Sequence, residues 1–428
     1  MVTLAAPDEP RAVPRLRPLR IVYVHQYYTN LAMGGGTRSF ELARRLVAQG
    51  HEVHVLTTRT EARRRSLRWR RTVEAGVQVH WFDVPYDNSM SYRRRIKAFA
   101  EFAATATARA ISLDPDLVFA TSTPLTVAVP GVVAARVRRV PFVFEVRDLW
   151  PEVPIALGAL RGRPSRRLAF ALARWAYRNA QAVVALSPGM AAGVAAHGVG
   201  PERIAVVPNA CDVSLFQVDA AAVRAFRDAR PWLQDRKLVV YAGTLGLANR
   251  VEYLVDVAAE VARRDPEVRF LVLGRGKEHD HVAARARAAG VLDTSLFMTG
   301  FVAKSEMPVV LGAATIATSL FAPNPALHDN SANKFFDALA AGRPVAINYG
   351  GWHADLLRES GAGLVLDPEN VPASAAALVA AIDDAAWLRQ AGAAARALAA
   401  DRFDRDVLFE VFSGVLTGAA DSDRRAGR

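Results

Sequence analysis

The sequence lacks a second cysteine, a signal peptide and a clear membrane-spanning run. With Cys211 as the single cysteine in 428 residues, a disulfide framework and a thiolate metal cage are excluded, and a reducing cytosol fits. The first residues have neither the basic start nor the apolar core of a signal peptide. One uncharged stretch, 117–135, contains Pro124 and Pro130, and we predict a strand, a turn and a helix start there. We therefore expect a cytoplasmic protein.

Patterns that would bind a metal ion are also scarce. Asp114 and Asp116 directly precede a predicted strand, and we interpret them as part of a turn. The paired histidines at 51 and 54, and at 279 and 281, lack convincing further ligands. We expect no metal site and no cofactor.

The positive charge is concentrated in one half of the chain. Residues 1–215 contain 30 Lys and Arg against 16 Asp and Glu, whereas the remainder contains 24 against 26. This asymmetry favours an anionic partner for the first half over a general effect on solubility. No recognised nucleic-acid-binding motif accompanies the charge, and few aromatic residues lie between the basic ones, so we expect no nucleic acid.

Two basic clusters contribute to this excess. One runs from Arg63 to Arg71 around Trp69, and the other spans 93–97, where an apolar stripe at helical spacing begins and runs to Ala110. Positive charge at a helix start opposes the helix dipole, so helix stability does not explain the second cluster. An anionic lipid or a lipid-linked pyrophosphate would explain the second cluster. We therefore predict peripheral binding to the inner face of the membrane. Solvated basic surfaces are the alternative.

Short β-branched runs alternate with amphipathic helical segments along the chain, as in parallel sheets that are covered on both faces. A polar, helical connector near 214–236 divides these runs into two series. We predict an α/β fold of two Rossmann-like, doubly wound domains that face each other across a cleft. The first covers 19–213 with a crossover helix at 403–418, the second covers 214–402, and residues 1–18 and 419–428 are expected to be disordered.

Loops that lead from a strand into a helix carry the ligand sites of such sheets. Gly34, Gly35 and Gly36 follow the first predicted strand, and Arg38 lies in the first turn of the next helix. Glycine lets backbone N–H groups approach an anion, and a helix N-terminus favours negative charge. The spacing is not that of a dinucleotide fingerprint. From these residues alone, a phosphate site and a flexible turn are equally open.

A second loop, within 328–351, carries a more specific pattern. Asp329 and Asp337 lie eight residues apart, and a helix is predicted to begin near 331–333. Lys334 places a cation in its first turn, where the helix dipole disfavours positive charge. A bound anion would remove this conflict, so we predict an anion site at the helix start. An ordinary capped helix with solvated charges is the alternative.

This segment resembles the E-x7-E region of retaining glycosyltransferase family 4, which has the GT-B fold, although both acids are Asp here. The usual tail of that region is present as DALAAGRP. The motifs RDLWP and NKFFD of this chain resemble those of bacterial transferases of surface-polysaccharide and amino-sugar assembly. Further segments resemble the same family in the same order between residues 20 and 415: GGGTRSFELARRL, PFVFEVRDLWPE, ALSPGM, PERIAVVPNACD, YAGTLGLANRVEYLV, FLVLGRGKE and FMTGFV.

The resemblance implies roles for the matching residues. Asp337 would hold the ribose hydroxyls of a nucleotide donor, Asp329 would face the donor sugar, and Phe301 would line the base. The groups placed near the sugar and the diphosphate are the backbone of Ala332, Asn333 and Lys334 and, from the first domain, Gly35 and Gly36.

Two departures from the family pattern affect the phosphate site. Thr244 and Asn249 stand where many members carry an Arg and a Lys, and Thr244 is still expected to be a donor-binding residue. Arg147 stands where many carry a His, immediately before Asp148. Arginine can make two parallel hydrogen bonds to a phosphate, so other cations could take over. The predicted phosphate ligands are Arg250, Arg275, Lys277 and Lys334, while Arg147 and Asp148 would orient the acceptor or the sugar.

The resemblance implies metal-independent transfer of a hexosyl or N-acetylhexosaminyl unit from a nucleotide sugar such as a UDP-sugar, with retention of the anomeric configuration. The catalytic residues would be Asp329, Lys334, Arg147 and Asp148. The acceptor would be a glycan, a lipid-linked intermediate or a small molecule. Two alternatives are a nucleotide-sugar epimerase of the same shape and a non-catalytic module that binds sugar nucleotides.

Overall fold

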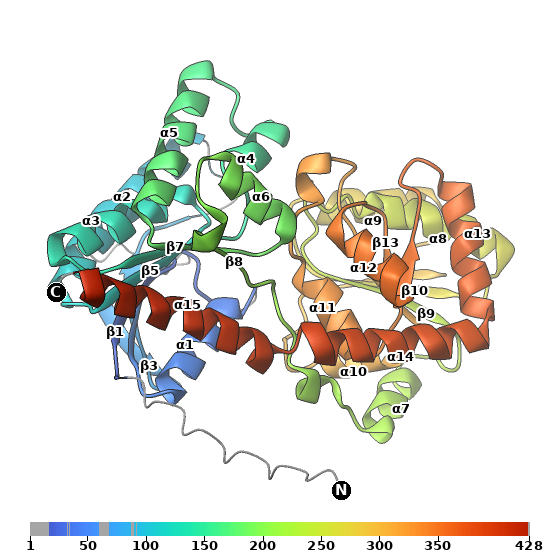
Figure 1. Cartoon of the computed structure of the whole chain (residues 1–428). Helices are drawn as coiled ribbons and strands as arrows, with labels where there is room; N and C mark the ends of the chain where they lie inside the picture. Colours follow the sequence, from blue (N-terminus) through green and yellow to red (C-terminus); the bar gives the residue numbers. More distant parts are fainter. Residues whose placement is uncertain are drawn as a thin grey trace, which may run out of the picture.

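The computed structural model describes residues 17–426, except 32, 34, 60–67, 87–89 and 91. They form two lobes, each built around a sheet with helices packed on it (Figure 1). The predicted pair of Rossmann-like domains is confirmed. Three of the sequence features lie outside the described residues, namely the chain before residue 17, Gly34 and the arginines at 63–65.

The first lobe contains an eight-stranded sheet in the order β3-β4-β2-β1-β5-β6-β7-β8. All of these pairings are parallel except that of β3 with β4. The strands are β1 Arg20–Val24, β2 Glu52–Arg59, β3 Arg70–Glu74, β4 Val77–Asp83, β5 Leu117–Thr121, β6 Phe142–Val146, β7 Ala182–Ala185 and β8 Ile204–Val206. The α-helices are α1 Arg38–Ala48, α2 Tyr92–Ser112, α3 Ala128–Arg138, α4 Glu152–Ala156, α5 Arg163–Asn179 and α6 Pro188–Ala196.

The second lobe contains a six-stranded parallel sheet in the order β11-β10-β9-β12-β13-β14, and each strand matches a predicted run. The strands are β9 Leu238–Ala242, β10 Arg269–Leu273, β11 Leu296–Thr299, β12 Ile316–Ser319, β13 Val345–Ile347 and β14 Gly363–Val365. The α-helices are α7 Ala220–Asp228, α8 Glu252–Arg264, α9 His279–Ala288, α10 Met307–Ala313, α11 Asn333–Ala340, α12 Trp352–Ser360, α13 Val371–Asp383 and α14 Ala385–Arg402.

Alternate side chains of the first sheet enter different apolar clusters. On β1, Val22 and Val24 pack in the cluster that contains residues of α2, α3 and α5, whereas Ile21 and Tyr23 pack in the cluster that contains residues of α1. Both faces of the strand are therefore dry, which explains why the central strands read as continuous apolar runs.

The antiparallel hairpin of β3 and β4 was not among the predicted strands. Ala75 and Gly76 form its two-residue turn, with φ of 50° and 82°. Two successive residues at positive φ match the twist of a hairpin, but alanine rather than asparagine stands at the first of them. The turn therefore lacks the usual sequence signature.

The apolar stripe on α2 packs into the core. Ala103, Ala106 and Ala110 are buried, and α2 packs against α3. Ile96, beside the basic cluster, is 48% exposed. Core packing therefore explains most of the stripe, while the basic residues at the helix start stay on the surface.

The chain passes between the lobes twice, and the two crossings are joined. The Cys211 amide donates to the Phe403 carbonyl at 3.0 Å, and the Arg405 amide donates to the Cys211 carbonyl at 2.9 Å. Asp212 accepts from Arg405 Nε at 2.7 Å and from Arg45 Nη2 at 3.2 Å. The two chain crossings therefore lie side by side and are held together by hydrogen bonds.

The last helix, α15 (Arg405–Ala426), returns to the first lobe, as its red ribbon shows in Figure 1. Phe412 and Leu416 are fully buried in the same cluster as residues of α1 and β1. We expected disorder from residue 419, and the helix instead continues to Ala426. Ala419 and Ala420 are buried in that cluster, which explains the extra turns.

Among the described residues, no single helix is long and apolar enough to cross a membrane. The pair α13 and α14 meets the criteria of length and composition together, but the two helices are bent by 92°. The uncharged stretch 117–135 forms β5, a 3-10 turn at Leu125–Val127 and the start of α3, as predicted.

Candidate functional site

A cleft of about 930 Å³ lies between the lobes. Most of its lining comes from loops that follow the carboxyl ends of strands in both sheets, where doubly wound folds bind ligands. The predicted site residues that line it are Gly35, Gly36, Arg147, Asp148, Thr244, Arg275, Phe301, Ala332, Asn333, Lys334 and Asp337.

The start of α11 presents an unneutralised cation to the cleft. Lys334 Nζ donates to Asn249 Oδ1 at 2.7 Å and lies 5.2 Å from the ring centre of Tyr241 and 5.3 Å from that of Phe321. In the described part of the chain no carboxylate forms an ion pair with it. Burial lowers the pKa of Lys334 to about 7. An anion in the cleft would supply the missing counter-charge and stabilise the charged amine.

The helix start itself adds unpaired donors. Ala332 is the N-cap residue of α11 and provides no side-chain cap, so the first N–H groups lack that partner. Asn209 of the first crossing holds the preceding residue in place, since its amide donates to Ser331 Oγ at 3.0 Å. The helix dipole and Lys334 therefore favour negative charge at the same point.

The glycine loop of the first lobe approaches this helix start closely. A Cβ atom on Gly36 would lie 3.1 Å from Asn333 Nδ2 and 3.5 Å from Arg147 Nη2. Gly35 has a φ of 130°, a backbone conformation that other residues rarely adopt. The two lobes therefore meet around the entrance of α11, and the glycines leave room there.

Asp337, one turn further along α11, is already paired. Its Oδ2 forms a short ion pair with Lys304 Nζ, and the two side chains are only 13% and 18% exposed. Lys304 lies in the loop after β11, three residues beyond Phe301, and it was not predicted. Its place at the carboxyl end of a strand is the signal that could have identified it.

Arg147 and Asp148 follow β6 on the opposite wall. Arg147 Nη1 donates to His25 Nε2 at 3.3 Å. Burial, reinforced by the charge of Arg147, lowers the pKa of His25 well below its ordinary value, so the imidazole is neutral. Burial raises the pKa of Asp148, and the charge of Arg147 acts in the opposite direction. His25 is a second cleft residue that was not predicted.

Arg38, in the first turn of α1, has a structural role. Its guanidinium donates to Glu145 Oε1 at 2.8 and 3.0 Å and to the carbonyls of Val207 and Pro208 at 3.0 and 2.6 Å. Arg38 and Glu145 are 3% and 0% exposed. Arg38 lines the cleft, but its charge is neutralised within the protein.

Three predicted site residues do not line the cleft. Arg250 is exposed, with Nε 3.6 Å from Glu252 Oε1, and Lys277 is exposed in the loop after β10. Asp329 packs against the first lobe at the start of α6, where a Cβ on Gly189 would fall 1.8 Å from its Oδ1. Burial raises the pKa of this carboxyl. The phosphate ligands predicted at Arg250 and Lys277 are therefore not brought together with Lys334.

The histidine pairs contact other side chains. His54 Nδ1 lies 3.0 Å from His80 Nε2, and His279 Nδ1 lies 3.0 Å from Asp280 Oδ1. Within the described ranges, no group of three His, Cys, Asp or Glu side chains could hold a metal ion.

Two family models match the chain, one in each lobe. The glycosyl transferase 4-like domain matches residues 33–210, and the glycosyl transferases group 1 domain matches residues 236–384. Both matches agree with the order of motifs in the sequence.

Individual proteins give the same result. The 2-deoxystreptamine glucosyltransferase of Streptomyces kanamyceticus is 28% identical over 275 residues, which are 64% of this chain and 69% of that protein. The glycogen synthase of Mycobacterium tuberculosis (strain ATCC 25618 / H37Rv) is 24% identical over 421 residues, 95% of this chain and 96% of that protein.

Solved structures share the fold over nearly the whole chain. HepE of Anabaena, in complex with UDP and glucose, superposes with a TM-score of 0.70 at 18% identity, covering 94% of this chain and 100% of that one. WaaG, a glycosyltransferase of lipopolysaccharide biosynthesis, superposes with a TM-score of 0.69 at 18% identity, covering 93% and 100%.

Proposed function

The chain belongs to the family 4 glycosyltransferases with the GT-B fold, and we propose that it transfers a sugar from a nucleoside diphosphate donor held at the start of α11. The observation that carries this proposal is Lys334, a cation in the cleft with a pKa lowered to about 7 and no carboxylate partner in the described structure. A diphosphate would neutralise it. HepE, which shares the fold, was solved with UDP and with UDP-glucose, which favours a uridine nucleotide.

The donor would lie along the second lobe. Its diphosphate would accept hydrogen bonds from Lys334 and from the backbone of Asn333, with Gly35 and Gly36 opposite. Its ribose would reach Asp337, whose carboxylate is held in place by its ion pair with Lys304. Arg275 and Phe301 would flank the base, since the guanidinium lies 6.0 Å from the ring centre.

The chemistry follows from the leaving group. The bond from the sugar C1 to the β-phosphate oxygen breaks while a bond to the acceptor oxygen forms, and negative charge grows on the diphosphate. Lys334 and the α11 dipole stabilise that charge without a metal ion. A phosphate oxygen takes the acceptor proton on the same face of the sugar, which gives retention. Arg147 and Asp148 orient the acceptor or the sugar from the opposite wall. The substrate is a hexosyl or N-acetylhexosaminyl donor.

Asp329 would face the donor sugar, as the resemblance implies, but from a position outside the lining of the cleft. Its carboxyl packs against Gly189 of the first lobe in this arrangement of the lobes. We propose that it meets the donor sugar from this contact, at the seam where the lobes touch. Domain closure then brings donor and acceptor together and excludes water.

A donor screen tests the proposal. UDP-, GDP-, dTDP- and ADP-sugars are compared by thermal shift, because a ligand at 100 times its Kd adds about 2.7 kcal/mol of stability. We expect one class of nucleotide sugar to raise Tm and then to support release of the nucleoside diphosphate when an acceptor is present. Proton NMR of the product identifies the anomer. Stabilisation by none of these donors would contradict the proposal.

The acceptor is a glycan, a small molecule or a lipid-linked intermediate presented at the inner face of the membrane. Exposed Arg93, Arg94 and Lys97 at the start of α2 lie beside Ile96, which is 48% exposed. Positive charge beside an exposed aliphatic side chain favours an anionic lipid surface. Vesicle flotation at several salt concentrations tests this, and binding that does not respond to salt would contradict it.

A further inference from the structure

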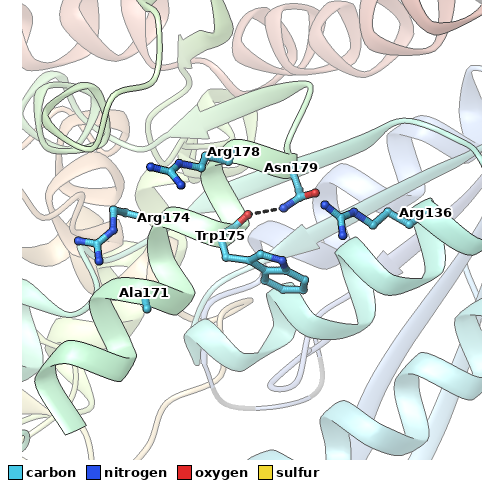
Figure 2. Close-up of a pocket in the computed structure, with 6 residues that line it drawn as sticks. All are labelled: Arg136, Ala171, Arg174, Trp175, Arg178 and Asn179. Carbon is cyan, nitrogen blue, oxygen red and sulfur yellow. Dashed lines mark hydrogen bonds between the residues drawn. The ribbon is translucent and has the colours of Figure 1, made fainter. Parts of the chain in front are cut away.

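Arginines without an ion pair line two hollows of the described structure, a small one in the first lobe and the cleft between the lobes. In the small hollow, of about 430 Å³ between α3 and α5, Figure 2 shows Arg136, Arg174 and Arg178 pointing in different directions. Arg136 and Arg178 stand in the last turns of their helices, where the helix dipole favours positive charge. The helix ends therefore explain most of this charge without a ligand.

The basic side chains of the cleft fall into two groups. Ion pairs neutralise one group, which consists of Arg38, Lys304 and Arg405. Within the described residues, no ion pair involves the other group, which consists of Arg147, Arg275 and Lys334. Arg275 lies beside Phe301, where the base is proposed to bind. Arg147 and Lys334 are therefore the charges that remain for the diphosphate, one from each lobe.

The second lobe alone offers little charge to a diphosphate. A sugar nucleotide carries a negative charge on each phosphate, and more charge develops when the sugar leaves. Thr244 and Asn249, which are both neutral, stand where many family members carry cations. Arg250 and Lys277 do not line the cleft. Lys334 is thus a single cation at a site that must hold more than one negative charge.

Arg147 approaches the start of α11 from the opposite lobe. A Cβ atom on Gly36 would lie 3.5 Å from Arg147 Nη2 and 3.1 Å from Asn333 Nδ2, so these two groups flank one point. The φ of Gly36 lies outside the positive range that favours glycine, so the backbone does not require glycine there. The missing side chain instead leaves space between a guanidinium and a helix N-terminus, which are both groups that bind phosphate.

Neutral groups hold Arg147 in place. Its amide donates to Ser122 Oγ at 3.0 Å, and its Nη1 donates to His25 Nε2 at 3.3 Å. Because arginine can only donate, Nε2 is the acceptor and the imidazole proton is on Nδ1. Burial lowers the pKa of His25 well below its ordinary value, so this imidazole stays neutral. Unlike Glu145 beside Arg38, His25 orients a guanidinium without cancelling its charge.

The position of Arg147 suits the second phosphate of the donor. With the ribose at Asp337 in the second lobe, the β-phosphate is the phosphate farther from the ribose and nearer to the first lobe. A residue that orients the sugar from this wall also lies beside the β-phosphate, because the bond that breaks joins the two. The guanidinium uses one N–H group on His25, and its other N–H groups remain for phosphate oxygens.

We propose that Arg147, oriented by His25, binds the β-phosphate of the donor from the first lobe, and that the diphosphate site is complete only when the two lobes meet. This role rests on the proposed function and adds a ligand to the donor site. Arg147 is then a catalytic residue, because it touches the leaving group, whereas His25 is a positioning residue. Because the donor bridges the lobes, nucleotide binding itself favours closure of the cleft.

Calorimetric titration with a nucleoside diphosphate and its monophosphate tests the role of Arg147. The probes are UDP and UMP, or the same pair for the base that the donor screen selects. We expect R147M to weaken UDP binding by about 30-fold, because hydrogen bonds between charged groups are lost, and to change UMP binding by less than about threefold. R167M, at an exposed arginine of the first lobe outside the cleft, is the matched control and should bind both like the wild type.

Two substitutions at His25 test the positioning role. H25Q keeps an acceptor for Arg147, whereas H25L removes it. We expect H25L to weaken UDP binding by roughly tenfold and H25Q by less than about threefold. In the R147M background H25L should have no further effect on UDP binding, because the two residues act through one contact. A purely structural histidine would show neither the rescue by H25Q nor this dependence on Arg147. Urea unfolding verifies that each variant is folded.

Comparison with K334M separates a failure of this role from a failure of the donor site. If R147M binds UDP like the wild type while K334M binds it more weakly, the role of Arg147 is overturned and the proposed function stands. A raised KM for the acceptor in that R147M protein would assign Arg147 to the acceptor instead. Equal losses for UDP and UMP in R147M would also overturn the contact with the β-phosphate. Unchanged UDP binding in both R147M and K334M would contradict the donor site itself.

Discussion

Two helices, α1 and α11, direct their first turns at the cleft from opposite lobes, and each carries a basic residue there. Arg38 of α1 is folded back onto Glu145 and is buried. Lys334 of α11 contacts a neutral amide and two aromatic rings. The same local pattern therefore gives a structural ion pair in one lobe and an anion site in the other. A basic residue at a helix start marks a ligand site only where the fold supplies no counter-charge.

The largest expected effect is on folding, at the first of these helices. R38M should lower the free energy of unfolding by about 3–5 kcal/mol, because Glu145 remains buried without its partner. Urea unfolding measures this, with R44M, at a partly exposed arginine of the same helix, as the control. If R38M folded normally but no longer bound nucleotide, Arg38 would be a ligand residue like Lys334. The proposed difference between the two helices would then be wrong.

The next effect is on catalysis, at the second helix. K334M should lower kcat/KM by about 10²–10³, or about 2.7–4 kcal/mol, because a cation that stabilises the leaving diphosphate is lost. Stability should not fall, since a desolvated cation without a counter-charge does not stabilise the fold. K277M, at an exposed lysine outside the cleft, is the matched control. Normal turnover in K334M would contradict the proposal that the diphosphate binds at the start of α11.

Lys304 is an intermediate case, because it forms an ion pair, as Arg38 does, and lines the cleft beside α11, as Lys334 does. K304M should weaken nucleotide binding by roughly tenfold, as expected for about 1.5 kcal/mol from a hydrogen bond to a charged group. Calorimetric titration with the nucleoside diphosphate measures it. Tighter binding in K304M would mean that the lysine only blocks Asp337.

The pH dependence tests the state of Lys334. Burial lowers its pKa to about 7, so the amine loses its charge as the pH rises through 7. Nucleotide affinity should then fall by up to about tenfold per pH unit above 7, and it should be flat in K334M over the same range. Because the unfolded chain keeps this proton to higher pH, the ligand-free protein should gain stability relative to K334M as the pH rises above 7. Affinity that does not change between pH 6 and pH 8 (roughly one unit on either side of that pKa) would contradict this assignment.

The smallest expected effect is that of a chelator. If protein cations stabilise the leaving group, EDTA should change turnover by less than about twofold. Activity that is lost with EDTA and restored by a divalent cation would show that Lys334 does not act alone.

Periodic features of the fold could be predicted from the sequence. The strands β9 to β14 are short apolar runs between helices, and local composition was sufficient to find them. The hairpin turn at Ala75 and Gly76 was missed because alanine at positive φ carries no recognisable signature. The extension of α15 was missed because Ala419 and Ala420 are buried by contacts with the other end of the chain.

The candidate site was predictable where residues follow one strand or open one helix. Lys334 and Asp337 belong to this group. The pairing of Arg38 with Glu145 joins residues that are 107 positions apart, so no local pattern reveals that Arg38 is neutralised. The same is true of Lys304 with Asp337, and of Asp329, which contacts the other lobe at Gly189. Contacts between residues that are far apart in the sequence, within one lobe or between the two, are thus the part that sequence patterns omit.

A crystal structure of the complex with the nucleoside diphosphate of the preferred donor tests the central claim most directly. The account predicts a β-phosphate oxygen about 2.8 Å from Lys334 Nζ and the ribose at Asp337, with the Arg38–Glu145 pair intact. A diphosphate bound elsewhere in the cleft, or bound by Arg38 after release of Glu145, would contradict it.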